Sequence, residues 1–78
     1  MTRAIRFGNY GVYVWDERRA QHHLPHAHIK NRDAEVGSIY LFTLTIYDQV
    51  EPIPRALVEL IEERRIELID LWARLNDE

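Results

Sequence analysis

Arg3-Ala4-Ile5-Arg6-Phe7-Gly8-Asn9-Tyr10-Gly11-Val12-Tyr13-Val14-Trp15 is the stretch that decides the start of the fold. Two β-rich runs flank the dipeptide Gly8-Asn9, and a two-residue link of this kind is a strong signal for a β-hairpin. Side chains alternate between the two faces of a strand, so we expect Tyr13 and Trp15 on one face and Val12 and Val14 on the other. The sequence therefore predicts an N-terminal antiparallel hairpin that is partly covered on both faces.

More strands are predicted after a polar loop over residues 16–25. Residues 26–30 alternate so that His26, His28 and Lys30 share one face. Residues 31–33 are typical of a turn, and residues 34–41 and 44–47 are typical of two further strands. Residues 1–50 are thus expected to form a small antiparallel sheet of four or five short strands.

The C-terminal part of the chain carries a helical pattern from residue 55 to about residue 76. Pro54 suits a first helical turn, because its missing N–H would have no partner there. Arg64 lies inside the apolar arc, which is unexpected for a buried stripe. We predict one long helix over 54–76 on one face of the sheet, making residues 1–78 a single α+β domain. The apolar residues that define the arc are Leu57, Leu60, Ile61, Leu68, Leu71, Trp72 and Leu75.

The apolar arc of this helix is wide for one small sheet. Val58 and Ile69 widen it, and Ile66 lies on its far side. An apolar surface that the sheet does not cover predicts a second protein surface. We therefore expect either a homodimer or a complex with a separately encoded small partner.

Charge is divided unevenly along the chain. The formal net charge is −3, yet residues 1–33 carry six Lys/Arg, three acids and all four histidines. Such a basic half is suited to a polyanion such as RNA, although it is equally typical of a solvated surface. The chain has no cysteine, which excludes disulfides and cysteine metal sites. No apolar run approaches the roughly 20 residues of a membrane span, and we expect a cytoplasmic protein.

The segment His22-His23-Leu24-Pro25-His26-Ala27-His28 holds the four histidines and the strongest functional signal. His26 and His28 are predicted on one strand face, roughly 6–7 Å apart from the strand rise. Two imidazoles that titrate near neutral pH form an acid/base pair suited to RNA cleavage without a metal. The phosphate would then be held by Lys30 with Arg18, Arg19 or Arg32, and either Tyr10 or Tyr13 would stack on a base.

Three other interpretations of the histidines stay open. His22, His23, His26 and His28 are possible ligands of a divalent transition metal such as zinc, with Asp16 or Glu17 completing the site. The histidine strand is alternatively a binding surface for a protein partner. In the last interpretation the histidines only bond to the backbone and shape the entry into a strand.

A resemblance to a known family is carried by the run Ile5–Val14, the step Pro25-His26-Ala27-His28 and the stretches 54–61 and 66–72. The chain resembles the small prokaryotic domain-of-unknown-function family 4160. The resemblance covers nearly the whole chain, although Leu24 stands where the family usually has a second proline. It implies a small sheet backed by a helix in a cytoplasmic bacterial protein. Family members are often encoded beside a second small protein, and such pairs are commonly proposed as toxin–antitoxin modules.

Together these observations predict a toxin-like protein that acts on RNA through His26 and His28 and pairs with an antitoxin-like partner. The ribonuclease chemistry in this prediction requires no cofactor. The alternative is a non-enzymatic protein-interaction module, with or without a histidine-bound metal.

Overall fold

The N-terminal hairpin forms as predicted in the computed structural model, which describes residues 2–15 and 24–76. Strands β1 (Thr2–Phe7) and β2 (Tyr10–Val14) pair antiparallel and are joined by the turn at Gly8-Asn9. Gly8 takes a φ of +59°, a left-handed conformation that glycine adopts without a steric penalty. The tight turn therefore depends on Gly8.

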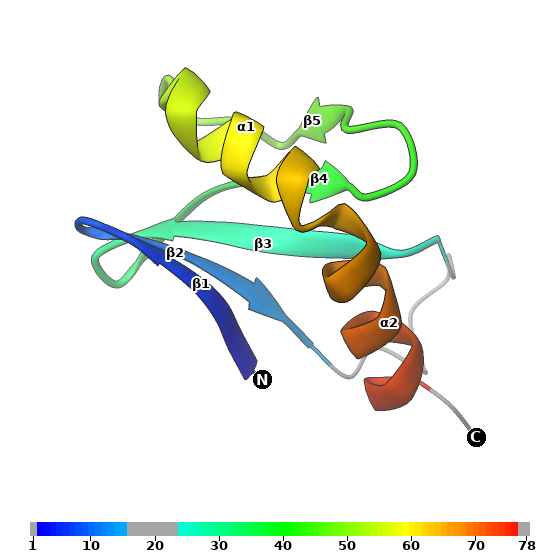
Figure 1. Cartoon of the computed structure of the whole chain (residues 1–78). Helices are drawn as coiled ribbons and strands as arrows, with labels where there is room; N and C mark the ends of the chain where they lie inside the picture. Colours follow the sequence, from blue (N-terminus) through cyan, green and yellow to red (C-terminus); the bar gives the residue numbers. More distant parts are fainter. Residues whose placement is uncertain (1, 16–23, 77–78) are drawn as a thin grey trace.

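Three more strands complete the sheet, namely β3 (His26–Asn31), β4 (Ala34–Tyr40) and β5 (Ile46–Tyr47). Each strand pairs antiparallel with the next, so within the described residues the spatial order is the chain order from β1 to β5 (Figure 1). The last strand is shorter than the predicted 44–47, because Leu44 takes a φ of +61° and its N–H bonds to the Tyr40 carbonyl in the preceding turn.

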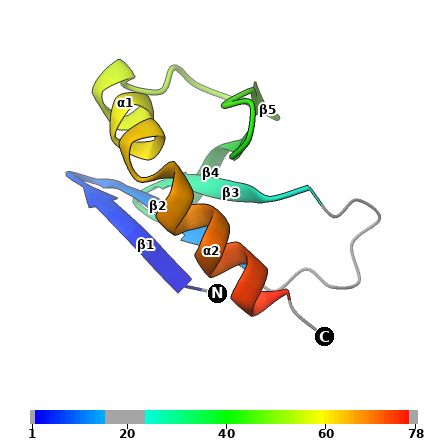
Figure 2. The same cartoon turned by 45° about the vertical axis from the view of Figure 1, so that its right-hand side comes forward.

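The prediction of one long helix is wrong, because the helical segment is broken at Arg64. Helix α1 (Arg55–Glu63) and helix α2 (Arg65–Leu75) meet at this residue, whose φ of −101° and ψ of 16° depart from helical values. Figures 1 and 2 show that the chain changes direction there. Arg64 is exposed at the break, which explains how a charged residue occupies the apolar arc.

The helices lie on one face of the sheet, and the core lies between the two layers (Figure 2). Leu57 and Ile61 enter it from α1 and Leu68 enters it from α2. Helix α2 packs against β2 and β3, so the bend at Arg64 allows the second helix to follow the sheet. The sheet contributes Ile5, Val12, Val14, Ala27, Ile29, Val36 and Ile39, with Leu41 just after β4.

The bend also changes the expectation of an uncovered helix surface. Val58, Leu60, Ile69 and Leu71 are partly buried against the core, and Ile66 is 74% exposed. A large share of the apolar arc is thus used within the chain, so the helices give little support to the predicted partner surface. Within the described residues, neither helix has the length and apolar character that crossing a membrane requires.

Asn76 fixes the end of α2 to the end of β2. Its side-chain N–H₂ donates to the carbonyl of Trp15 at 3.1 Å and to the carbonyl of Trp72 at 2.9 Å. The bond to Trp15 joins residues 61 positions apart in the chain, and the bond to Trp72 spans one helical turn. The end of the C-terminal helix is therefore attached to the chain at Trp15, directly after β2.

Truncating Leu68 tests this packing against a matched site on the same helix. Leu68→Ala should lower the free energy of unfolding by about 2–5 kcal/mol, the usual cost of emptying a buried leucine site, because Leu68 is 0% exposed. Ile66→Ala should change it by less than about 0.5 kcal/mol, as expected for an exposed position. Urea denaturation followed by circular dichroism measures both, and equal losses would contradict this placement of α2.

Candidate functional site

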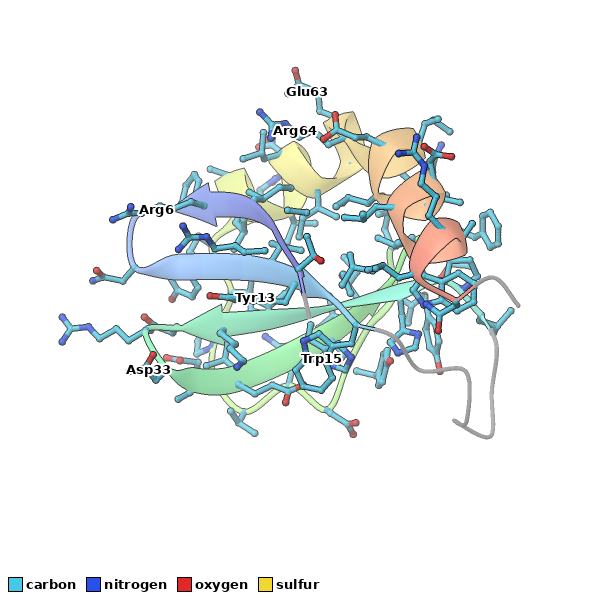
Figure 3. The ribbon with its side chains drawn as sticks, turned by 90° about the horizontal axis from the view of Figure 1, so that it is seen from below. Arg6, Tyr13, Trp15, Asp33, Glu63 and Arg64 are labelled. Carbon is cyan, nitrogen blue, oxygen red and sulfur yellow. The ribbon has the colours of Figure 1, made fainter. Side chains whose placement is uncertain are left out.

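The face of the sheet turned away from the helices is polar and aromatic; Figure 3 looks onto it, with Tyr13 and Trp15 in view. Residues directly opposite each other on paired strands share a face. The register places one such residue from each strand in a single row, which we call the central row: Arg3, Tyr13, His28, Ser38 and Tyr47. We call this surface of the sheet the polar face.

His28 lies in the middle of the central row. Its Nδ1 is 2.7 Å from Oε1 of Glu35 and 3.3 Å from the hydroxyl oxygen of Ser38. Because a carboxylate can only accept a hydrogen bond, Nδ1 of His28 carries the proton and its N–H donates a hydrogen bond to Glu35. The His28 ring also stacks on the Trp15 indole, with centroids 3.9 Å apart and planes 14° apart. Glu35 and Trp15 together fix the tautomer and the plane of the imidazole.

His26 is held by the backbone on one side and by rings on the others. Its Nδ1 donates to the Leu24 carbonyl at 2.7 Å. The rings of Tyr40, Tyr47 and Trp72 each lie 6.4 Å from the imidazole, centroid to centroid. With 2% exposure, this histidine is a buried residue of the sheet.

The prediction that His26 and His28 share a strand face is confirmed by their contact. Their ring centroids are 5.2 Å apart, and the planes meet nearly edge to face at 70°. Both imidazoles carry a proton on Nδ1, so Nε2 is the nitrogen of each ring that would accept or release a proton in a reaction. The neighbouring rings leave His28 only 9% exposed, a burial that the sequence did not predict.

Lys30 and Tyr13 extend the site toward the hairpin. The Lys30 ammonium lies 5.1 Å from the centroid of the Tyr13 ring and 5.8 Å from that of Trp15, within the range of cation–π attraction. The Tyr13 ring lies over Gly11, where an added Cβ would come within 2.7 Å of its Cε1. Gly11 thus permits the ring of Tyr13 to lie flat on the polar face.

A basic depression of about 260 Å³ opens at the hairpin end of the molecule. Arg32 reaches it from the β3–β4 turn, where a φ of +59° and a 2.7 Å bond from its N–H to the Asn9 carbonyl hold the turn against the hairpin. Two turns distant in sequence therefore form one site. We call this site the arginine depression; it is lined by Arg3, Arg6, Gly8, Asn9, Tyr10, Gly11, Tyr13, Arg32 and Asp33.

The predicted substrate-binding residues divide into two places. Lys30 and Tyr13 accompany the histidines, whereas Arg32 lies in the arginine depression. Arg18 and Arg19 are outside the described residues, and so are His22, His23, Asp16 and Glu17 of the predicted metal site. No group of three or more His, Cys, Asp or Glu side chains within the described residues is arranged to hold a metal ion.

The metal prediction thus stays a hypothesis that involves residues beyond the described ones. The Nδ1 atoms of His26 and His28 both bond to oxygen, so a metal would be bound through Nε2.

Sequence reasoning missed Glu35 and Ser38 as partners of His28. Strand alternation alone could have placed Ser38 on the polar face. The register shift between Ile29 and Lys30 interrupts that alternation and brings Glu35 opposite Lys30. A bulge of this kind has no clear signal in the sequence, so Glu35 was not identifiable.

No family model, curated protein or solved structure matches this chain. The resemblance to family 4160 therefore stays a prediction, and the candidate site rests on its own geometry.

The Glu35 contact predicts which nitrogen of His28 is protonated. Long-range proton–nitrogen NMR spectra at a pH where the ring is neutral should show the Nδ1–H tautomer in the wild type. Glu35→Ala removes the carboxylate and should reduce the Nδ1–H fraction at His28, while His26 keeps its bond to the Leu24 carbonyl and serves as an internal control. An Nε2–H tautomer of His28 in the wild type would contradict the assigned hydrogen bond.

Proposed function

We propose that this chain is a toxin-like, RNA-directed protein whose substrate lies on the polar face and is cleaved with His26 and His28 as acid and base. The observation that carries the proposal is the contact of Glu35 with His28 of the central row, with the ring centroids of His26 and His28 5.2 Å apart. A histidine oriented by a carboxylate beside a second histidine is an arrangement suited to proton transfer. Lys30 lies beside the pair as a positive charge for a phosphate.

The reaction that fits the pair is cleavage of RNA by its own 2′-hydroxyl. Nε2 of one imidazole takes the proton of the 2′-hydroxyl, whose oxygen attacks the neighbouring phosphorus. The bond from phosphorus to the 5′-oxygen breaks, and the second imidazole gives a proton to that oxygen from its Nε2. The products are a 2′,3′-cyclic phosphate and a free 5′-hydroxyl, and the two histidines end with exchanged protonation.

Glu35 assigns complementary roles to the two rings. The carboxylate at Nδ1 stabilises the positive charge that His28 carries when both its nitrogens are protonated. Within the described residues, the Nδ1 proton of His26 is donated to a carbonyl, that of Leu24, and not to a carboxylate. We assign His28 as the acid and His26 as the base.

Access to the pair requires the Trp15 ring to move off His28. The indole N–H of Trp15 is buried and has no hydrogen-bond partner in the described part of the chain. Displacing the ring therefore breaks no hydrogen bond of that N–H, and in water the group gains one. An RNA base that replaces the indole on the imidazole would restore the lost stacking contact.

The test of this proposal is RNA cleavage by purified variants. His28→Gln should slow cleavage by about 10²–10⁴-fold, the range for removing a general acid. Glu35→Gln should also slow it, because an amide that donates to Nδ1 holds the His28 ring in the other tautomer. Glu63→Gln, which removes an exposed acid on α1 away from the polar face, should cleave like the wild type.

Melting curves show that the variants are folded, and expression in a bacterial host tests growth in parallel. Growth arrest that persists in folded His28→Gln together with unchanged RNA cleavage would refute the catalytic assignment.

The second candidate is a non-enzymatic interaction module, and an apolar depression favours it. This depression has a volume of about 290 Å³ and is lined by Leu24, Pro25, Tyr40, Phe42 and Thr43. The side chain of Phe42 is 59% exposed. A large exposed aromatic beside an apolar hollow is typical of a protein-contact surface.

Self-association through this depression is tested with Phe42→Ser. If the depression joins two copies of the chain, sedimentation equilibrium should show a wild-type dimer, and Phe42→Ser should raise the dissociation constant at least about tenfold, as for other interface anchors. Val50→Ser, another exposed apolar position, is the matched control. A wild-type monomer at high concentration would remove the homodimer from consideration.

A further inference from the structure

The arginine depression concentrates positive charge that the described part of the chain does not neutralise. Three guanidinium groups, those of Arg3, Arg6 and Arg32, line it, and Asp33 is the one acid among its lining residues. None of the three arginines forms an ion pair or side-chain hydrogen bond with a described residue, whereas Arg74 on α2 is paired with Asp70. Like charges placed together without partners repel one another, and a bound anion removes that cost.

The position of the depression connects it to the central row. Arg3 belongs to that row and lies two strands away from His28, which corresponds to about 10 Å at the spacing of neighbouring strands. Arg6 lies opposite Gly11, and Gly11 lies opposite Lys30. The depression and the histidine pair are therefore two parts of one polar face, with Tyr13 between them.

Tyr13 gives the depression a second property besides charge. Its ring lies over Gly11, takes part in lining the depression and faces the Lys30 ammonium. An aromatic ring beside guanidinium groups suits a nucleotide, because the base stacks while the phosphate receives paired N–H donors. A free phosphate would use the arginines alone.

We propose that the arginine depression binds a backbone phosphate of single-stranded RNA, with the adjoining base on Tyr13. The inference rests on the RNA-directed function proposed above and specifies where the strand is held outside the histidine pair. Arg3, Arg6 and Arg32 supply guanidinium contacts to the phosphate, and Gly11 keeps Tyr13 flat for the base. The strand then runs along the central row from Arg3 toward His28.

The experiment measures binding of a fluorescent RNA of about eight nucleotides, a length that small β domains cover, by anisotropy at several salt concentrations. The RNA carries a 2′-O-methyl group at every residue, so the 2′-oxygen cannot attack the phosphorus and binding is separated from cleavage. Arg3→Ala, Arg6→Ala and Arg32→Ala should each weaken binding about tenfold, as expected for a charge-assisted contact. Each should also lower the salt slope by about 0.7, the value for one phosphate contact on a single strand.

Two further variants test the parts of the site separately. Arg55→Ala removes an exposed arginine at the start of α1 and should leave affinity and slope unchanged. Gly11→Val adds a side chain where Tyr13 lies and should weaken oligonucleotide binding while leaving the slope nearly unchanged, because no phosphate contact is removed. Inorganic phosphate, titrated as a competitor, should bind far more weakly than the oligonucleotide.

The outcomes separate this inference from the proposed cleavage. Arginine-dependent binding supports the site, even if the wild type cleaves no natural RNA and the catalytic proposal fails. Cleavage that depends on His28 but proceeds at wild-type rate and affinity in all three arginine variants would overturn the site and leave the proposed function intact. Absence of oligonucleotide binding by the wild type at low salt, or equal losses in Arg55→Ala, would also overturn it.

Discussion

The antiparallel register across β2, β3 and β4 is the constraint on which the rest of the structure depends. Ala27 and Ile29 are fully buried beneath the helices, so the alternation of β3 requires His28 and Lys30 to face the other way. A slip of one residue would exchange the two sets and place an imidazole in the apolar core. The same packing that stabilises the fold thus decides which side chains can meet on the polar face.

Burial of two imidazoles adds a requirement that the surrounding residues meet. A buried polar group without a hydrogen bond destabilises the fold, and both rings satisfy one nitrogen with an oxygen acceptor nearby. They are surrounded by the aromatic ring of Trp15, which follows β2, and by rings from β4, β5 and α2. Asn76 then joins the carbonyls of Trp15 and Trp72, which come from the two ends of the chain. The C-terminal helix therefore stabilises the site as well as the core.

Local patterns predicted a large part of this arrangement. The Gly8-Asn9 hairpin and the common face of His26, His28 and Lys30 follow from spacing alone and are present in the structure. The break at Arg64 was not predicted, because the helical pattern continues across it and only the shape of the sheet decides where the axis turns. Glu35 was not predicted, since a bulge sets its position.

The distribution of charged residues in the folded structure differs from their distribution along the sequence. The acidic half of the chain includes the helices, yet α1 and α2 carry arginines as well as acids and pair Arg74 with Asp70. Positive charge instead accumulates at one end of the polar face, where Arg3 and Arg6 on β1 meet Arg32. At 0.1 M salt a charge acts over about 10 Å, which is close to the separation of two strands. A polyanion near this end therefore experiences the local arginines more than the net charge of −3, and its attraction falls away toward the helices.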